Sequence, residues 1–487
     1  MPLKIYNTLT KEKEPFVPIE PGKIKMYVCG VTVYDSCHIG HARAGVIFDV
    51  VYRYLKHLNF QVTYARNFTD IDDKIIRRSQ ELDMDYKALT QKYIQEYLDE
   101  MKLLNVSEPS MQPRATENID EMIRVIQGLI GKGFAYATGG DVYYEVSKFA
   151  SYGRLSRRSL EEMCAGARIS PDEKKTHPED FALWKAAKPG EPYWVSPWGN
   201  GRPGWHIECS CMSMKHLGDS IDIHGGGSDL IFPHHENEIA QSEGFTGKPF
   251  AHYWIHNEMI MIEQTKMSKS LGNVFVLKQL LKEYAGKEIR FFLLSKHYKT
   301  PMDFSFELLN ESKQAFSRLE SSVARALDLV KHATESAESS LIYQDWMRQF
   351  KECMDDDFNT PKALGIVFRL MAQINQDVDK GTPHSKIQDE LKSVLTMLDL
   401  LGVKVDAQNI QKISQEIELD QGKIKEILQS LNWSDDEVEY LVKARESARR
   451  KKIWTLADQI RVALREKGVE VQDEKDGAKI IRPNRHF

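Results

Sequence analysis

Apolar runs of strand length alternate with apolar positions at helical spacing along the N-terminal part of the chain. Met26–Gly30 is a short apolar run that ends at glycine, and Gln61–Phe68 is a second strand-like run. Between them, helical spacing predicts a helix that begins near Ile39. Its apolar positions are Ile47, Val50, Val51, Tyr54, Leu55 and Leu58. This strand–helix–strand order predicts a parallel sheet and therefore an α/β fold.

The pattern changes over Asn105–Pro197, which we interpret as an insertion that splits the sheet domain. A helix over Thr116–Gly131 precedes two strand-like runs joined around Gly139–Gly140, a typical hairpin turn. After the insertion, Asp219–His224 has the alternation of a short buried strand, and His252–Glu263 is also strand-rich.

Helical periodicity dominates from Lys282 to Leu401, where three apolar stripes predict the core of a helix bundle. The stripes are Phe316, Leu319, Val323, Leu327 and Val330; Leu364, Val367, Met371 and Ile374; and Leu391, Val394 and Leu398.

Gly402–Phe487 is expected to form a separate unit. Its segment Lys443–Lys467 holds nine basic and three acidic residues, which suits a nucleic-acid backbone, although a solvated face is the usual alternative. We expect Trp454 to anchor this helix rather than stack on a base.

The composition is that of an ordinary water-soluble protein with several domains. The chain has 487 residues, of which 41% are hydrophobic and 28% charged, and its formal net charge is −5. No segment has the apolar character of an export signal or a membrane span, so we expect a cytoplasmic protein. Six cysteines in a chain of this length fit a reducing compartment rather than a disulfide framework.

Gly204–Glu243 combines residue types that bind metal ions. Cys209 supplies a thiol, and His234 and Glu238 are spaced to lie one helical turn apart on one face. Zinc accepts thiolate, imidazole and carboxylate ligands and usually takes four in a structural site, so one more thiolate is needed. Cys29, far upstream, is available. Spacing alone leaves open that the cysteines are simply small buried residues.

His38 and His41 flank the start of the helix predicted from Ile39. A strand–loop–helix unit presents unpaired N–H groups and the positive helix end to an anion, so this turn suits a phosphate. Two histidines beside a glycine are also common at ordinary surface or core positions. Likewise, Lys266 and Lys269 in a polar loop could reach phosphates or simply be solvated.

Three aspartates, Asp70, Asp72 and Asp73, follow the second strand. They could form a metal cluster, but acidic side chains at a helix start also accept hydrogen bonds from its free N–H groups. We therefore predict capping and loop contacts for them.

Together these segments resemble the cysteinyl-tRNA synthetases, a family of class I aminoacyl-tRNA synthetases. His38-Ile39-Gly40-His41 is similar to the first signature of that class, and Lys266-Met267-Ser268-Lys269-Ser270 is similar to the second. Other similar segments are CGVTVYDSCHIGHAR, NFTDIDDKII, GRPGWHIECS, IDIHGGGSDLIFPHHENEIAQSE, KMSKSLGN, HYKTPMDFS and DDDFNTPKAL. The family's four zinc positions correspond to Cys29, Cys209, His234 and Glu238.

The resemblance implies a Rossmann-like parallel-sheet catalytic domain with an insertion, followed by a helix bundle and a small C-terminal domain. The domains expected from it are 1–115 with 197–265 (catalytic), 116–196 (connective), 266–315 (KMSKS loop and stem contact), 316–401 (helical bundle) and 402–487 (anticodon-binding).

It also implies a ligase reaction, in which L-cysteine and ATP form cysteinyl-adenylate and the cysteinyl group passes to the 3′ end of tRNA(Cys). One Zn²⁺ per subunit would select the substrate thiol, Mg²⁺ would accompany ATP, and a monomer is expected. The catalytic residues implied are His38, His41, Lys266 and Lys269. ATP would be bound by these four with Gly40 and Asp229, and the amino acid by Thr69, Trp205 and His224.

Two other functions are considered for this chain. A cysteine ligase of mycothiol synthesis would resemble the catalytic half but would not need a basic terminal domain. A catalytically silent RNA-binding protein is disfavoured by the complete signatures.

Three features depart from the family pattern: Cys211 stands where a small residue is usual, Val31 replaces a common proline, and the tail lacks its usual tryptophan.

Overall fold

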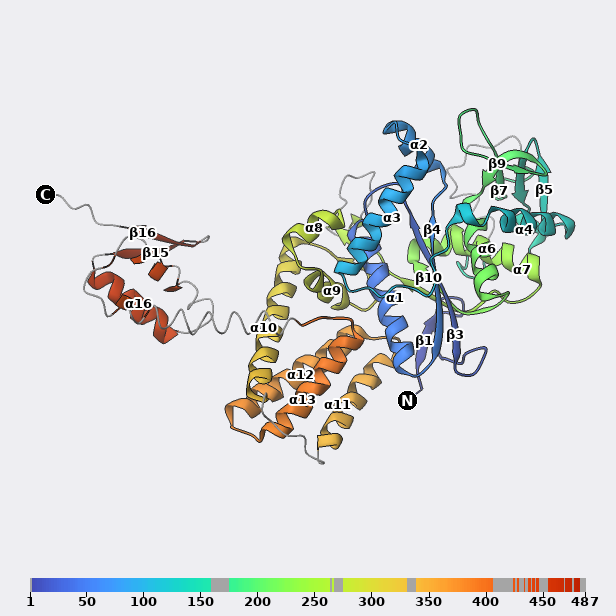
Figure 1. The fold of residues 1–487 in the computed structure, drawn as a ribbon. Helices are drawn as coiled ribbons and strands as arrows, with labels where there is room; N and C mark the ends of the chain where they lie inside the picture. The colour runs from blue at the N-terminus through green and yellow to red at the C-terminus, as the bar shows by residue number, and fades with distance from the viewer. Residues whose placement is uncertain are drawn as a thin grey trace. The chain divides into compact units, whose positions relative to one another are not determined.

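The computed structural model describes residues 2–158, 175–262, 265–266, 275–330 and 339–405, together with parts of 424–481. The chain divides into two compact units, Met1–Val405 and Asp406–Phe487. The first unit contains a parallel sheet with helices on both faces, an antiparallel sheet and a helix bundle (Figure 1). Among the described residues, no helix combines the length and the apolar character that crossing a membrane requires.

The central sheet has four strands in the order β11-β10-β3-β4, and every pairing is parallel. Helix α1 (Ile39–His57) follows β3, as the apolar spacing predicted, and α7 (Glu236–Thr246) lies between β10 and β11 in the chain. The α/β prediction is therefore confirmed. The strands are β3 (Lys23–Thr32), β4 (Gln61–Thr69), β10 (Ile221–Gly227) and β11 (Ala251–Asn257).

Alternate residues of β3 point to opposite faces of the sheet and enter two different cores. Met26 and Val28 belong to the apolar cluster that contains α1 and α3 residues. Tyr27 and Cys29 belong to a second cluster, with residues of α4, α6 and α7. Both faces are covered, which explains why the strand is apolar along its length. These helices are α3 (Tyr86–Leu103), α4 (Ile119–Gly131) and α6 (Trp205–Leu217), and α2 (Asp73–Glu81) precedes α3 in the chain.

A register shift between Val28 and Val31 interrupts the pairing of β3 with β4. Gly30 lies in this irregularity, where an added Cβ would come within 1.6 Å of the main-chain oxygen of Asn67. Only glycine allows such a close approach of two backbones. Because the irregularity directly follows Cys29, it helps to set the direction in which the Cys29 side chain projects from the strand.

The region inserted between β4 and α6 contains a five-stranded antiparallel sheet of order β5-β6-β7-β9-β8. The hairpin predicted around Gly139–Gly140 is confirmed, since β5 and β6 pair across these two glycines and both have positive φ. Its strands are β5 (Ala135–Thr138), β6 (Asp141–Tyr144), β7 (Phe181–Ala186), β8 (Trp194–Ser196) and β9 (Gly199–Pro203). Short 3-10 turns are η1 (Ala115–Glu117) and η2 (Val146–Lys148).

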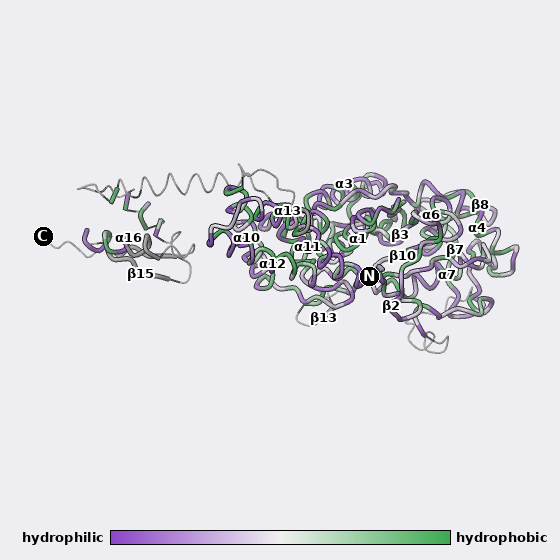
Figure 2. The backbone as a smooth tube through the Cα atoms, turned by 90° about the horizontal axis from the view of Figure 1, so that it is seen from below, coloured by the Kyte–Doolittle hydropathy of each residue, from purple (hydrophilic) through white to green (hydrophobic). Residues whose placement is uncertain are grey.

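The three apolar stripes predicted for a helix bundle lie in its core. Leu327 is half-buried and all other residues of the stripes are buried. Figure 2 shows apolar and polar residues alternating along these helices, as expected for helices with one buried face. The elements from the central sheet to the end of the bundle are β12 (Ile260–Ile262), β13 (Thr265–Lys266), α8 (Leu277–Glu283), α9 (Gly286–Leu294), β14 (Met302–Asp303), α10 (Phe306–Val330), α11 (Ser339–Met354), α12 (Thr360–Asp379) and α13 (His384–Leu400).

The second unit contains one described helix of several turns and an antiparallel pair of strands, around a small apolar core. Helix α16 (Trp454–Glu466) falls in the segment predicted to be a basic helix, and the strands are β15 (Glu470–Glu474) and β16 (Gly477–Ile481). The side chain of Trp454 lies outside the described residues. The predicted domain boundaries stay predictions. At the N-terminus, β1 (Lys4–Asn7) pairs with β2 (Glu12–Pro15).

Candidate active site

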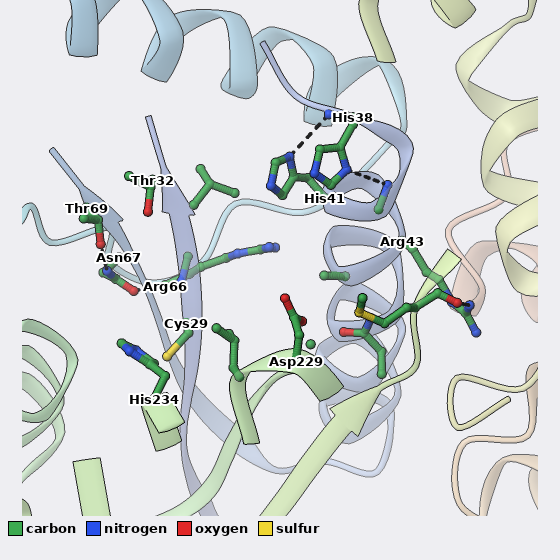
Figure 3. Close-up of a pocket in the computed structure, with 18 of the residues that line it drawn as sticks. Cys29, Thr32, His38, His41, Arg43, Arg66, Asn67, Thr69, Asp229 and His234 are labelled. Carbon is green, nitrogen blue, oxygen red and sulfur yellow. Dashed lines mark hydrogen bonds between the residues drawn. The ribbon is translucent and has the colours of Figure 1, made fainter. Parts of the chain in front are cut away.

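A cavity of about 330 Å³ opens at the carboxyl ends of the parallel strands, the edge where open α/β sheets bind ligands. Each of the four strands ends beside it. The lining residues include Cys29 and Thr32 of β3, Asn67 and Thr69 of β4, Gly227 of β10, and Asn257 of β11 (Figure 3). The cavity therefore collects side chains that are far apart in the sequence.

Cys29, Cys209 and His234 line one end of the cavity. Together with Glu238, which lies behind them, they are here called the four-donor cluster. Each residue offers one donor atom, and the four atoms lie within 4.8 Å of one another. Oε1 of Glu238 is 3.2 Å from Sγ of Cys29 and 3.0 Å from Nε2 of His234. All four side chains are buried.

The local fold explains how these donors meet. Cys29 comes from β3 and Cys209 from the second turn of α6. His234 lies in a single irregular helical turn, η4 (Ile231–His235), and Glu238 lies in the first turn of α7. His234 and Glu238 thus lie one helical turn apart, but His234 is in this irregular turn and α7 itself begins at Glu236.

Burial and neighbouring charges set the protonation of the cluster. Burial raises the pKa of the Glu238 carboxyl, but His224 and His234 outweigh burial and hold that pKa well below its usual value. The hydrogen bond with Cys29 is the largest influence on Cys209 and lowers its pKa to about 6. Burial lowers the pKa of His234, yet Glu238 and Cys209 raise it to about 10. Thiolate, imidazole and carboxylate in one buried group fit a divalent metal ion.

His224, expected to contact the amino acid, lies behind the cluster and is not among the residues that line the cavity. Its Nε2 is 2.8 Å from Oε2 of Glu238, and its ring stacks on Trp254 with centroids 4.5 Å apart. A second compact donor set replaces Cys209 and His234 by His224 and His235. The observed contact of His224 is with Glu238, and its contact with substrate stays a prediction.

Three further histidines surround the cluster and were not predicted as site residues; His235 and His256 are buried and His206 is half-buried. Nδ1 of His206 is 2.9 Å from Nδ1 of His234, and Nδ1 of His235 is 2.8 Å from Nε2 of His256. Burial is the main cause that lowers the pKa of His206 and His235, and it lowers that of His256 to about 3. Two sequence features could have indicated them: the adjacent histidines at 234–235 and the histidines within the apolar run of β11.

Thr69 and Trp205, both predicted to contact the amino acid, line the cavity. The Thr69 hydroxyl donates a hydrogen bond to Oε2 of Glu208 at 2.8 Å, and burial raises the pKa of this carboxyl well above its usual value. Trp205 is 38% exposed, and its ring centroid lies 4.5 Å from that of His234. Their predicted roles stay predictions.

His38 and His41 lie at the other end of the cavity, at the start of α1 as predicted. His38 is the N-cap residue, and its Nδ1 accepts a hydrogen bond from the N–H of Gly40 at 3.1 Å. Nδ1 of His41 is 3.3 Å from the main-chain nitrogen of His38, and the two rings stack with centroids 3.7 Å apart. Asp229, from the short turn η3 (Ser228–Leu230), lines the same cavity (Figure 3).

The predicted lysine pair is described only in part. Lys266 lies in β13, but its side chain and all of Lys269 lie outside the described residues. Arg43, two residues after His41, was not predicted as a site residue although it lines the cavity. Its buried guanidinium donates hydrogen bonds to four main-chain oxygens, those of Met259, His297, Tyr298 and Thr300.

The acidic residues after β4 make the capping and loop contacts that we predicted. Asp72 is the N-cap of α2. Asp70 accepts a hydrogen bond from the Thr116 hydroxyl at 2.6 Å, and Asp73 pairs with Lys185 at 2.7 Å.

Cys211, the spare thiol, is buried but does not belong to the four-donor cluster. Burial raises its pKa well above the usual value, and the charges that act on it most strongly are Glu121 and Arg124, at the start of α4. Residues two positions apart on a helix project from nearly opposite sides, which explains its separation from Cys209.

Comparison with protein families matches three successive parts of the chain. Residues 15–314 match the class I (C) tRNA synthetase catalytic domain, residues 349–405 the DALR domain, and residues 434–480 the cysteinyl-tRNA ligase anticodon-binding domain. Curated relatives match over the whole length. A cysteine–tRNA ligase of Geobacter metallireducens is 48% identical over 98% of this chain and 99% of its own length. That of Sulfurihydrogenibium sp. is 46% identical over the same shares.

Solved structures with similar folds are also class I synthetases. A Mycobacterium tuberculosis methionyl-tRNA synthetase with methionyl-adenylate has a TM-score of 0.60 at 12% identity, covering 82% of this chain and 93% of that chain. A LeuRS–tRNA–LeuAMS complex of Agrobacterium radiobacter K84 has a TM-score of 0.61 at 11% identity, covering 82% and 86%. At these identities the likeness shows the fold alone.

The family match extends through the C-terminal domain, which favours a tRNA ligase over the mycothiol alternative. It also favours an enzyme over a silent RNA-binding protein. The chain therefore belongs to the cysteinyl-tRNA synthetase family, enzymes of class I that act with tRNA, an amino acid and ATP.

Proposed function

We propose that this enzyme activates L-cysteine with ATP to cysteinyl-adenylate and transfers the cysteinyl group to the 3′ end of tRNA(Cys). The observation that carries the proposal is a single cavity with the four-donor cluster at one end and the His38–His41 turn at the other. In the first step a carboxylate oxygen of cysteine attacks the α-phosphorus of ATP, and the bond to pyrophosphate breaks. Such a reaction asks the protein mainly to position the two substrates and to stabilise charge.

The four-donor cluster would hold one Zn²⁺. When bound, this ion would ligate the thiolate of the substrate, whereas the hydroxyl of serine is a harder and far less acidic ligand. Serine and cysteine have nearly the same shape, so an apolar pocket alone would separate them poorly. Thr69 and Trp205, which line the same cavity, would bind the rest of the amino acid.

The His38–His41 turn would bind the nucleotide. The first N–H groups of α1 and the positive end of this helix favour phosphate, and His38 and His41 add hydrogen-bonding imidazoles. Gly40 permits close approach, and Asp229 would bind the nucleotide from the opposite side of the cavity. Lys266 and Lys269, with Mg²⁺, would neutralise the charge of the departing pyrophosphate.

The remaining regions would bind tRNA(Cys). We assign residues 402–487 to the anticodon and residues 266–315 to the stem, in line with the family match over 434–480. The basic residues around α16 suit a phosphate backbone. We further propose that 116–196 is the connective domain, that 316–401 is the helical bundle, and that the enzyme acts as a monomer in the cytoplasm.

The decisive measurement is ATP–pyrophosphate exchange with cysteine and with serine, before and after removal of the metal by a chelator. We expect exchange with cysteine only, its loss on chelation, and its return when zinc is added back. The metal content of each sample is measured in parallel. Charging of tRNA(Cys) with cysteine then tests the second step.

Two results would change the proposal in different ways. Cysteine-dependent exchange that survives confirmed metal loss would keep the synthetase but remove the role of zinc in selection. Absence of exchange with any substrate and any metal would contradict the proposed activity itself.

A further inference from the structure

We propose that Glu208 is a positioning residue that turns the Thr69 hydroxyl into a hydrogen-bond acceptor for the α-ammonium group of the amino acid. The inference rests on the proposed function, because it takes cysteine to be bound in this cavity. Neither residue belongs to the four-donor cluster, and Glu208 does not line the cavity. Glu208 therefore acts on the substrate only through Thr69.

The direction of one hydrogen bond is the first argument. A threonine hydroxyl has one proton to donate and two lone pairs that accept. The proton of Thr69 is donated to Oε2 of Glu208 at 2.8 Å, and this carboxyl is only 1% exposed. Asn67 donates its amide N–H to the same hydroxyl at a longer distance of 3.4 Å. One lone pair remains for a ligand in the cavity that Thr69 lines.

A group that only accepts selects ligands that donate. The α-ammonium of an amino acid has three N–H donors and no acceptor, so it matches a hydroxyl whose own proton is already committed. If the hydroxyl were free to turn, its proton would point at the ammonium in some orientations. Glu208 removes those orientations.

The position of Thr69 relative to the four-donor cluster is the second argument. The side chain of Asn67 lies beside Thr69 (Figure 3) and spans the two, since its Oδ1 is 3.7 Å from Sγ of Cys209 while its Nδ2 contacts Thr69. The same Oδ1 accepts the N–H of Gly30 at 2.8 Å, which fixes the amide orientation. A single asparagine side chain therefore separates Thr69 from the cluster. A cysteine whose sulfur contacts the cluster would hold its amino group near Thr69.

The incomplete bonding of Glu208 is the third argument. Its second oxygen, Oε1, is buried and has no hydrogen-bond partner among the described residues. A buried carboxyl that served packing alone would cost stability without a second bond. Its one bond is directed to a residue of the cavity, which points to a role in binding.

The test compares two ligands on the metal-loaded enzyme. Dissociation constants are measured by calorimetry for cysteine and for 3-mercaptopropionate, which is cysteine without its amino group. Thr69→Val removes the hydroxyl at nearly constant shape, and Glu208→Met removes the acceptor at similar length. Thr69→Ser keeps the hydroxyl and serves as the matched control.

We expect Thr69→Val and Glu208→Met to raise the dissociation constant of cysteine about ten- to a hundredfold, as for loss of one hydrogen bond to a charged group. That of 3-mercaptopropionate should change less than about twofold by the same reasoning, and zinc content should stay at one per chain. Thr69→Ser should bind both ligands like the wild type.

Other outcomes overturn the inference. Equal weakening of both ligands, or loss of zinc in the variants, would show that Glu208 and Thr69 only support the four-donor cluster. An unchanged cysteine affinity in Thr69→Val would remove the hydrogen bond itself. If the wild type binds neither ligand, the proposed function fails as well, so the two failures are distinguishable.

Discussion

The two ends of the cavity are built in opposite ways. At the four-donor end, Glu238 is inaccessible to solvent and contacts Cys29, His224 and His234 at once. At the other end, His38 and His41 are half-buried and Asp229 is exposed. The first end places polar side chains in the interior of the protein, whereas the second relies on a helix start that is open to the cavity.

This difference matches what each end would recognise under the proposed function. Selection of a thiol needs donors fixed before the ligand arrives, and only buried groups that hold one another provide such order. A phosphate is bound well by main-chain N–H groups and a helix end, which the fold supplies without burying charge. Changes at the four-donor end should therefore affect stability and metal content, and changes at the helix start should affect mainly the reaction rate.

The largest effect is expected for Glu238→Gln. The amide keeps the shape but cannot accept from both histidines and also act as an anionic ligand. We expect metal content and cysteine-dependent exchange to fall at least about a hundredfold, since even indirect support of a metal costs ten- to a hundredfold. The free energy of unfolding should fall by about 3–5 kcal/mol, as for a broken buried ion pair.

Metal analysis and denaturant unfolding measure these two effects. Glu243→Gln, on the same helix α7, is the matched control because its carboxylate pairs with Arg154 away from the cluster. It should keep metal and exchange at wild-type levels. Full metal content in Glu238→Gln would show that this carboxylate is not a ligand.

At the helix start, His38 allows capping to be separated from chemistry. His38→Ala removes the cap and should lower the free energy of unfolding by about 1 kcal/mol, whereas His38→Asn keeps a good N-cap and should not. Both should lower the exchange rate about a hundredfold, because both lose the imidazole that we propose binds the phosphates. Recovery of exchange in His38→Asn would show that His38 serves only the helix.

The sequence was sufficient for features that depend on local pattern. Helix α1 and strand β4 follow from spacing, because apolar side chains every three to four or every two residues must face a core. The four-donor cluster was different. Cys29 and Glu238 are 209 positions apart, so spacing could not pair them, and only the family resemblance brought them together.

Contacts that depend on three-dimensional arrangement were not predictable. Arg43 looks like an ordinary helical arginine, but its partners lie more than two hundred positions away, at Met259 and in the segment 297–300. Glu208 next to Cys209 gave no sign that it would meet Thr69 across the sheet and helix. Both contacts arise from how distant segments pack, which no local periodicity encodes.

Changes in the second unit should not affect activation at all, because this unit is proposed to contact only the tRNA. Arg461 and Arg465 are exposed on α16. Reversing both charges to glutamate should raise KM for tRNA(Cys) about tenfold, through loss of phosphate contacts. ATP–pyrophosphate exchange should be unchanged. Lys248→Glu, at an exposed position after α7, is the control for charge alone. A change in exchange would contradict this division of roles.

The smallest expected effect concerns a buried carboxyl without the partners that Glu238 has. Glu100 on α3 is 4% exposed, and neither of its oxygens has a hydrogen-bond partner among the described residues. Burial, with the charge of Glu96, raises its pKa to about 7. Because the folded pKa lies above the unfolded value, the protonated carboxyl favours folding, and this contribution is lost as the pH rises through about 7.

Glu100→Gln should therefore raise the free energy of unfolding at pH 8 and leave it nearly unchanged at pH 4. We expect a gain of about 1 kcal/mol, since one pKa unit corresponds to about 1.4 kcal/mol and partial solvation reduces the full shift. Denaturant unfolding at the two pH values measures it, with exposed Glu108→Gln in the loop after the same helix as control. An equal gain at both pH values would assign the effect to packing, and the contrast with Glu238 would no longer rest on charge.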